Sequence, residues 1–385
     1  MENNKTPSIR FKGFTDPWEQ RKVFEIADRF DNLRVPVAAN LRIPGNTPYY
    51  GANGIQDYVE GYTHDGEYIL VAEDGASDLK NYPVNYVNGR IWVNNHAHVL
   101  QGKEKIANNK FLSYAMRLAD IESVLVGGGR AKLNADIMMN LDIAIPSFNE
   151  QEQIGAYFSN LDNLITLHQR KYDKLQNIKK SMLEKMFPKN GSNVPEIRFS
   201  GFTDPWEQRK FGDVGSVSMC KRIFKNETSD GGDIPFYKIG TFGGEPDAYI
   251  SRELFEEYKK KFSYPNEGDI LLSASGTIGR IVEYTGEDAY FQDSNIVWLS
   301  HDKSICNKFL KVLYPTVKWD GIEGSTIKRL YNDNFLKTQF MMPKIEEQER
   351  LGEYFEQLDH LITLHQRELE KLQNIKKSML EKMFV

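Results

Sequence analysis

The sequence is short of the features that mark several classes of protein. Its 385 residues include only two cysteines, Cys220 and Cys306, which lie far apart and form no metal-ligand pattern. No run approaches the roughly 18 consecutive apolar residues that predict a transmembrane helix, and the N-terminus lacks the apolar core of a signal peptide. These absences predict a reduced, cytoplasmic protein with no metal site and no membrane partner.

Catalytic motifs are absent as well. There is no GxxxxGK[ST] loop for ATP, and the run at 127–129, Gly-Gly-Gly, does not have the GxGxxG spacing of a dinucleotide site. HExxH, CxxC and GxSxG are missing, and so is the Asn-Pro-Pro-Tyr or Asp-Pro-Pro-Tyr element of adenine amino-methyltransferases. Several independent absences favour a binding protein over an enzyme. We therefore predict no catalytic residue and no cofactor in this chain.

Positive charge is not in excess either. The chain has 49 Lys and Arg against 54 Asp and Glu, a net charge of −5, whereas nucleic-acid-binding domains usually show a basic footprint. The charge is segregated, however, because residues 169–189 carry many more basic than acidic side chains. The acidic total therefore does not exclude DNA, and a basic partner subunit would offset it.

The chain repeats itself. Residues 9–22 and 197–210 both read IRFxGFTDPWEQRK and differ at one position; we call them the GFTDPW blocks. Residues 150–187 and 347–384 are identical at 29 of 38 positions and share the run KLQNIKKSMLEKMF. The stretches between these blocks match only in scattered places. An internal repeat determines the architecture of a chain. Here the repeated blocks form a shared frame, and the unlike stretches between them predict two related tasks on two different targets.

Both repeated segments at 150–187 and 347–384 have apolar residues at spacings of three and four. Sustained spacing of this kind predicts helices with a coiled-coil seam, which two near-identical helices can bury against each other in an antiparallel pair. His168 and His365 occupy equivalent seam positions, and a role in register is favoured over a metal or catalytic role because no acid or cysteine has ligand spacing to them. The predicted seam residues are Phe158, Leu161, Ile165, Leu175, Phe355, Leu358, Ile362 and Leu372.

The inserts between the blocks read as small sheets with polar loops. Gly66–Val71 and Gly268–Ser273 are short apolar runs that each precede a glycine-containing turn, and strand-like stretches follow at 90–100 and 290–299. Within the GFTDPW block, Asp16–Glu19 predicts a turn entering a helix. The predicted fold class is α+β: two mixed α/β domains joined by a long antiparallel two-helix coiled coil, in a pseudo-two-fold internal repeat.

Side chains that can pair with base edges or phosphates are concentrated in the loops. Asn and Gln can pair with adenine, and Arg and Lys with guanine; small residues beside basic ones allow a close approach to phosphate. Val126–Leu133 and Glu323–Leu330 combine these features at equivalent positions. The alternative for each residue is a solvated loop. The candidate DNA-binding residues are Asn46, Asn53, Gln56, Lys80, Asn94, Asn95, His96, His98, Arg130, Lys132, Lys221, Arg222, Lys238, Thr241, Ser273, Ser275, Thr277, Arg280, Lys328 and Arg329.

The GFTDPW blocks and the repeated EQExxGxYFxxLDxLITLHQR…KLQNIKKSMLEKMF segment resemble the specificity subunit of type I restriction–modification systems, over nearly the whole chain. The resemblance implies two target recognition domains, each reading one half of an asymmetric, bipartite sequence in double-stranded DNA. It implies that the helices space the domains and dock two modification (methyltransferase) subunits. Catalysis would lie in the partners: the modification subunits would bind S-adenosylmethionine, and two restriction (nuclease and translocase) subunits would use ATP and Mg²⁺.

The resemblance and the repeat together predict five segments. They are a first target recognition domain (1–149), a first long helix (150–187), a linker (188–196), a second target recognition domain (197–346) and a second long helix (347–385). Two other functions stay open at this point. One is a self-contained DNA methyltransferase or nuclease with unrecognised catalytic residues, and the other is a two-headed scaffold that binds proteins.

Overall fold

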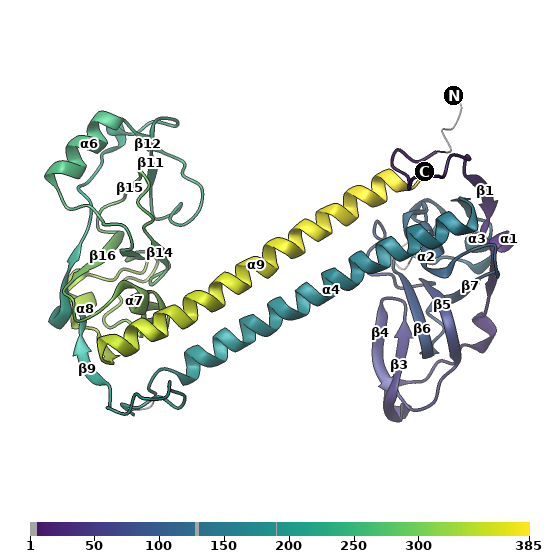
Figure 1. The fold of residues 1–385 in the computed structure, drawn as a ribbon, viewed down its shortest axis with the longest axis horizontal. Coiled ribbons are helices and arrows are strands. Elements are labelled where there is room, and N and C mark those ends of the chain that lie inside the picture. Colours follow the sequence, from purple (N-terminus) through teal and green to yellow (C-terminus); the bar gives the residue numbers. More distant parts are fainter. Residues whose placement is uncertain (1–5, 128–130, 190) are drawn as a thin grey trace. The chain divides into compact units, whose positions relative to one another are not determined.

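A computed structural model describes residues 6–127, 131–189 and 191–385. The chain forms two compact units: unit 1 combines residues 1–169 with 367–385, and unit 2 spans 170–366. Each of the two long helices therefore contributes one end to each unit (Figure 1). As a result, each unit contains parts of both halves of the repeat.

Unit 1 is built on a six-stranded sheet in the order β2-β7-β5-β6-β3-β4, in which only β3 and β6 run parallel. Alternate residues of β5 enter different cores: Ile69 and Val71 join the cluster that contains α2, and Tyr68 and Leu70 pack on the other face. The elements are β1 (Glu19–Lys22), α1 (Val23–Ile26), β2 (Ala27–Arg29), β3 (Pro44–Gly51), β4 (Gly54–Val59), β5 (His64–Ala72), β6 (Val84–Val93), β7 (Ala97–Gly102), α2 (Asn109–Leu118), α3 (Ala135–Met139), β8 (Asp142–Ile145) and the start of α4 (Phe148–Lys185), with 3₁₀ turns at Asp31–Leu33, Ala39–Leu41 and Glu122–Val124.

Unit 2 carries two smaller sheets, ordered β10-β16-β13-β14 and β12-β11-β15. Leu272 and Phe309 belong to one core, which includes residues of the long helices, whereas Phe255 and Trp298 belong to a second core. The elements are β9 (Glu207–Lys210), α5 (Phe211–Val214), β10 (Gly215–Ser218), β11 (Ile234–Tyr237), β12 (Tyr249–Ile250), α6 (Arg252–Lys261), β13 (Ile270–Ser273), β14 (Ile281–Glu283), β15 (Tyr290–Phe291), β16 (Ile296–His301), α7 (Asn307–Leu313), α8 (Asn332–Lys337), β17 (Gln339–Met342) and the start of α9 (Ile345–Met383), with 3₁₀ turns at Lys225–Glu227 and Tyr314–Thr316.

The predicted mixture of sheet and helix is confirmed, but the GFTDPW block needs a correction. Asp16–Glu19 does not enter a helix: Glu19–Lys22 forms β1, which pairs antiparallel with β8 immediately before the long helix. The second block forms β9 in the same way, paired with β17. Each block thereby ties the beginning of its insert to the end, and its tryptophan, Trp18 or Trp206, is buried.

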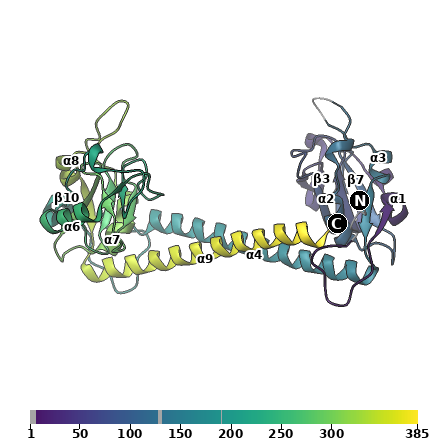
Figure 2. The same ribbon diagram turned by 90° about the horizontal axis from the view of Figure 1, so that it is seen from above.

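In unit 1 the beginning of α4 packs against the end of α9. The buried Phe158 ring lies 5.9 Å from the Phe384 ring, centroid to centroid, and Lys376 donates to the Asp162 carboxylate. Residue numbers rise along α4 as they fall along α9, so the two segments are antiparallel. The C-terminal end of α9 also lies against the N-terminal segment (Figures 1 and 2), since the Ile9 N–H donates to the Lys382 carbonyl at 3.0 Å.

In unit 2 the other two ends pack by equivalent contacts. Lys179 donates to Asp359, and this pair is related to Lys376–Asp162 by the 197-residue offset of the repeat. Phe187, just beyond α4, lies 5.6 Å from the Trp206 ring. Among the predicted seam residues, three are only half-buried, and the others are buried: Phe158, Leu161, Phe355, Leu358 and Ile362. No helix in the described part of the chain is long and apolar enough to cross a membrane.

A buried ion pair fixes each GFTDPW block to a long helix. Arg10 donates from Nε and Nη2 to the two oxygens of Glu150 at 2.7 and 2.8 Å, and Arg198 makes the same two bonds to Glu347 at 2.7 Å each. The glutamine that follows each of these glutamates bonds three backbone groups of its own unit. The two units therefore share one frame down to individual hydrogen bonds.

Candidate nucleic-acid interface

Both units carry a short hairpin where the insert returns towards its long helix. In unit 1, Val126 and Lys132 exchange backbone hydrogen bonds of 2.9 Å, and in unit 2, Glu323 and Arg329 do so at 3.0 and 2.8 Å. A glycine follows Val126 and Glu323, with φ of +93° and +97°, a conformation that favours glycine. We call these residues, with Leu133 or Leu330 next to them, the hairpin bases. They occupy equivalent places in the repeat.

Unit 1 brings several predicted residues together around its hairpin base. Asp74, in the turn after β5, forms a β-bridge with Lys132, and the Leu133 N–H donates to the Glu73 carbonyl at 2.7 Å. Asn53, between β3 and β4, bonds two backbone groups of the same turn at 2.8 and 2.9 Å. Polar residues from three distant parts of the sequence thus meet at one surface.

Unit 2 repeats this arrangement with different side chains. Ser275, in the turn after β13, forms a β-bridge with Arg329, and the Gly276 N–H donates to the Lys328 carbonyl at 2.9 Å. Arg280 leaves this turn and packs against Gly243, two residues after Thr241. The same platform therefore presents a different set of donors and acceptors in each unit.

Most of the candidate residues are accessible. His96, Lys238 and Thr241 are half-exposed. Among the described candidates, five basic groups have acidic partners: His96 with Asp74, His98 with Asp31, Lys132 with Glu73, Arg222 with Asp293 and Lys238 with Asp247. Arg130 lies outside the described residues. The candidates with exposed side chains are Asn46, Asn53, Gln56, Lys80, Asn95, Lys132, Lys221, Arg222, Thr277, Arg280, Lys328 and Arg329.

The structure corrects four of the predicted contacts, whose side chains are buried: Asn94, His98, Ser273 and Ser275. The Ser273 hydroxyl, for example, accepts from the Arg280 N–H at 2.9 Å and donates to the Thr277 carbonyl at 2.5 Å. It therefore shapes the turn that carries these two residues and does not face a ligand. A polar side chain in a loop sequence can be a structural hydrogen-bonding group as readily as a reader of bases.

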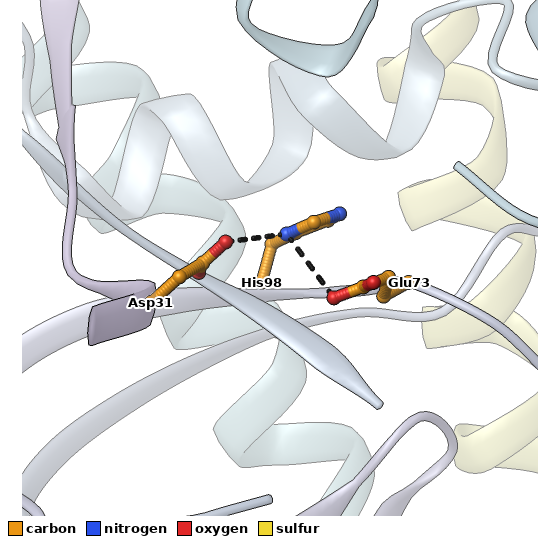
Figure 3. Close-up of side chains that lie close together, drawn as sticks. All are labelled: Asp31, Glu73 and His98. Carbon is orange, nitrogen blue, oxygen red and sulfur yellow. Dashed lines mark hydrogen bonds and ion pairs between the residues drawn. The ribbon is translucent and has the colours of Figure 1, made fainter. Parts of the chain in front are cut away.

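Beneath the hairpin base of unit 1, His98 is held between acidic side chains (Figure 3). Its Nδ1 lies 2.7 Å from Asp31 Oδ2 and 3.7 Å from Glu73 Oε2, and its Nε2 lies 2.9 Å from the Leu133 carbonyl oxygen. The side chain is only 2% exposed. The Leu133 carbonyl oxygen can only accept, so Nε2 donates this hydrogen bond, and Nδ1 lies against the Asp31 carboxylate.

Three further cations complete this cluster. Arg34 Nη1 and Lys132 Nζ lie 2.7 and 2.9 Å from the Glu73 carboxylate, and Arg34 Nη2 and Arg29 Nε lie 3.5 and 3.7 Å from Asp31. The Asp31, Glu73 and His98 ligand atoms are close enough together to hold a metal ion, but both carboxylates already have cationic partners. The arrangement therefore fits an ion-pair network, which we call the unit 1 network.

The sequence prediction missed Asp31, Arg34 and Glu73. They come together with His98 only through the register of the sheet, in which Val71 of β5 lies opposite His98 of β7. No local pattern in the sequence signals this pairing.

Acid should weaken unit 1 through this network. Burial alone would raise the pKa of Asp31, but the His98 hydrogen bond and charge, the Val99 amide and Arg34 outweigh it and lower that pKa from 3.8. Burial is likewise outweighed at Glu73 by Arg34 and Lys132, which lower its pKa from 4.5. Carboxylates with lowered pKa stabilise the fold fully above their unfolded values and lose that contribution as the pH falls through the folded ones. Urea unfolding of unit 1 followed from pH 6 to pH 3 should show this loss.

The control for this effect is the double variant Asp31→Asn, Glu73→Gln, which removes both titrating groups. It should be less stable at pH 6 and should show a flatter pH dependence in unit 1. An equally steep dependence in this variant would contradict the assignment.

Comparison with known proteins agrees with this architecture. The sequence model of the family described as "Type I restriction modification DNA specificity domain" matches residues 15–177 and 203–374. A putative type I restriction enzyme specificity subunit of Haemophilus influenzae, S.HindORF215P, is 45% identical over 383 residues, which cover 94% of each chain. The specificity subunit of the MjaVIII type I restriction enzyme of Methanocaldococcus jannaschii is 24% identical, over 73% of this chain and 70% of that one.

A solved structure shares the fold. The type I restriction–modification S subunit from M. genitalium superposes with a TM-score of 0.68 over 99% of both chains, at 15% sequence identity. The chain belongs to the family of type I restriction–modification DNA specificity subunits. The family prediction is thus confirmed, together with its assignment to DNA recognition; catalysis in these systems belongs to other subunits.

Proposed function

We propose that each unit reads one half of an asymmetric, bipartite sequence in double-stranded DNA, and that α4 and α9 space the units and dock two modification subunits. One observation carries the proposal: the same frame presents unlike surfaces in the two units. The ion pairs Arg10–Glu150 and Arg198–Glu347 and the two hairpin bases are equivalent, whereas unit 1 has one six-stranded sheet and unit 2 has two smaller ones. Equivalent frames with unlike readers suit a site whose halves differ in sequence.

The chemistry of the exposed candidates supports DNA as the ligand. Lys132 and Arg329 lie on the hairpin bases, and Lys328 precedes Arg329; basic side chains at such places can contact phosphates and fix the register on the duplex. Asn46 and Gln56 on the β3–β4 hairpin of unit 1 have side chains that can pair with adenine, and Arg280 of unit 2 has one that can pair with guanine. Such a protein works where the DNA is, so we place it in the cytoplasm.

We propose that the length of the helices sets the gap between the half-sequences. α4 and α9 have 38 and 39 residues, about 57–59 Å at roughly 1.5 Å per residue. The boundary between the units falls after Gln169 in α4 and after Gln366 in α9, which are equivalent positions of the repeat. Two readers spaced in this way would leave a stretch of base pairs between their half-sequences unread.

Inserting seven residues at both of these boundaries should therefore lengthen the unread gap and leave the half-sequences unchanged. Two helical turns add about 10 Å, or about 3 base pairs at roughly 3.4 Å each. Sequencing of methylated adenines in cells that carry the variant with its modification subunit would measure the gap. The control is a seven-residue insertion in the linker at residue 190, which should change nothing. A change in either half-sequence would contradict a spacer role for the helices.

The docking surface that we propose for the modification subunits is a pair of exposed leucines on each helix. Leu164 and Leu167 on α4 are 44% and 45% exposed, and their repeat equivalents Leu361 and Leu364 on α9 are 40% and 45% exposed. Leucines three residues apart are neighbours on a helix face and form an apolar patch that a partner can cover, and two equivalent patches suit two copies of one partner. We propose that these partners bind S-adenosylmethionine, and that two restriction subunits, which use ATP and Mg²⁺, complete the assembly.

The double variant Leu361→Asp, Leu364→Asp should therefore lose one of the two modification subunits. Interface residues that contribute strongly to binding cost more than about 1 kcal/mol each when they are replaced, so binding at this face should weaken at least tenfold. Native mass spectrometry of the purified assembly would count the subunits. Thr363→Asp adds a charge to the same helix turn away from the leucine face and should keep both copies. Two bound copies in the leucine variant would contradict the proposed surface.

A domain exchange tests the reading function itself. Replacing residues 211–346 with those of a relative should change one half of the methylated sequence and leave the other half as it was. A change in both halves would contradict modular reading. Methylation or cleavage of DNA by the purified chain alone, given S-adenosylmethionine and Mg²⁺, would favour the enzyme alternative. Failure to bind any duplex with the modification subunit present would favour the protein scaffold.

A further inference from the structure

We propose that Asp31, Glu73 and His98 are positioning residues that hold the hairpin base of unit 1 through hydrogen bonds and ion pairs, and that unit 2 holds its equivalent hairpin base without them. The consequence for DNA rests on the proposed function: only the half-sequence read by unit 1 should depend on this network.

The contacts of the network converge on the hairpin base. His98 Nε2 donates to the Leu133 carbonyl at 2.9 Å, and the Glu73 backbone carbonyl accepts from the Leu133 N–H at 2.7 Å. The Glu73 carboxylate lies 2.9 Å from Lys132 Nζ. Lys132 and Leu133 are therefore held by both backbone and side-chain bonds. These bonds fix the position of the strand and the direction of the Lys132 side chain.

Unit 2 provides an internal comparison, because the register of its sheet identifies the equivalent residues. Leu272 lies opposite Val297 as Val71 lies opposite His98, so Val297 takes the place of His98. The Leu330 N–H donates to the Ala274 carbonyl at 2.8 Å, so Ala274 takes the place of Glu73. The GFTDPW blocks are offset by 188 residues, which places Met219 at the position of Asp31.

Met219, Ala274 and Val297 all belong to, or pack against, the apolar core of unit 2. The equivalent positions thus form an apolar cluster in unit 2 and a charged cluster in unit 1. The fold itself therefore does not require the charges. Burying charged groups costs desolvation free energy, and apolar residues of similar size often replace such clusters without loss. The charged groups instead fix the orientation of the hairpin base, because a hydrogen bond fixes geometry more closely than an apolar contact does.

The network also leaves positive charge at the hairpin base. Arg29, Arg34 and Lys132 supply three cations, and Asp31 and Glu73 supply two carboxylates, so these permanently charged groups leave an excess of one positive charge. Lys132 is the accessible member, with a side chain that is 46% exposed. A lysine held in one direction by a fixed carboxylate is a pre-organised contact for a phosphate oxygen.

The first test needs no DNA. In the full chain, Asp31→Met, Glu73→Ala and His98→Val together install the residues of unit 2 at the positions of the network. Hydrogen exchange of the Val126, Lys132 and Leu133 amides should become at least about tenfold faster, because their acceptors are no longer held. The equivalent amides of unit 2, at residues 323, 329 and 330, are the internal control and should not change.

A second variant covers the case in which the triple substitution disturbs the fold. Glu73→Gln keeps the size and the backbone carbonyl but removes the charge that holds Lys132 and Arg34, and it should accelerate exchange in the same direction. The Ile69–Val71 amides of β5 report on the core of unit 1. If β5 stays protected while the hairpin base keeps the exchange rates of the wild type, the proposal is overturned.

The Nε2–H of His98 gives a readout that simple loss of packing would not change. In ¹⁵N-labelled chain, this proton should exchange slowly because it is held in the hydrogen bond to the Leu133 carbonyl, and Asp31→Asn should make it exchange faster. A fast-exchanging Nε2 proton in the wild type would overturn the assignment. In the assembly with the modification subunit, the triple variant should relax the half-sequence read by unit 1 and preserve the other. If the wild type does not methylate DNA, the proposed function fails, and the exchange experiment still decides this inference.

Discussion

Glu347→Ala should reduce the free energy of unfolding of unit 2 by about 3–5 kcal/mol, the usual cost of removing one partner from a buried ion pair. The Glu347 side chain is 2% exposed and binds Arg198 through both carboxylate oxygens. Without it, the Arg198 guanidinium stays in the frame with its main acceptors gone, at the junction of the GFTDPW block and α9. Urea unfolding with hydrogen exchange resolved for each unit would measure the loss.

Two variants serve as controls for this effect. Glu150→Ala removes the equivalent carboxylate and should weaken unit 1 by a similar amount, while unit 2 keeps its stability. Glu356→Ala removes a carboxylate from the exposed pair with Lys308 and should change little, because exposed ion pairs contribute little to stability. Equal effects of Glu347→Ala and Glu356→Ala would show that the frame does not depend on its buried pairs.

The repeat explains why the frame could be predicted from the sequence. Identity over residues 150–187 and 347–384 fixes two long helices, and Pro146 and Pro188 bracket the first one, which runs from Phe148 to Lys185. The apolar residues at spacings of three and four mark the faces that are buried. These signals are local and periodic, so a single sequence carries them.

The pairing within the frame left no such signal. Arg10 and Glu150 are 140 residues apart, and neither differs locally from a surface residue. Strand β1 was missed because its four residues, Glu19–Lys22, are all polar and mostly exposed. These residues form a strand because they pair with β8, and their own β-propensity would not predict one. Tertiary context commonly overrides a local pattern in this way.

The candidate site was predicted in part, for a related reason. Composition located the loops, and residues such as Lys132 and Thr277 are exposed as expected. Composition does not separate a polar group that faces solvent from one that is bonded inside a turn, and Ser273 and His98 belong to the second kind. The distinction depends on strand register, which brings residues 31, 73 and 98 together and has no counterpart in any short stretch of sequence.

Deleting residues 372–385, at the far end of the chain from the first insert, should unfold unit 1 and spare unit 2. This end of α9 supplies part of the unit 1 core: Met383 is 4% exposed, and the Phe384 ring lies 5.4 and 5.9 Å from Phe111 and Trp18. Removing one buried aromatic or methionine costs about 2–5 kcal/mol. The loss of several such residues exceeds the 5–15 kcal/mol that typically stabilises a domain.

The matched variant for unit 2 is Phe187→Ala, since Phe187 stacks on Phe309 and meets Trp206 as Phe384 does Phe111 and Trp18. It should weaken unit 2 by about 3–5 kcal/mol and leave unit 1 unchanged. Hydrogen exchange would separate the two effects, with the β5 amides reporting on unit 1 and the β13 amides on unit 2. If β5 stays protected in the truncated chain, the end of α9 is not part of the folding unit of the first insert. Loss of protection in β5 alone would show that the second half of the repeat completes the core of unit 1, and a weakened unit 2 in Phe187→Ala would show that the first half contributes to the core of unit 2.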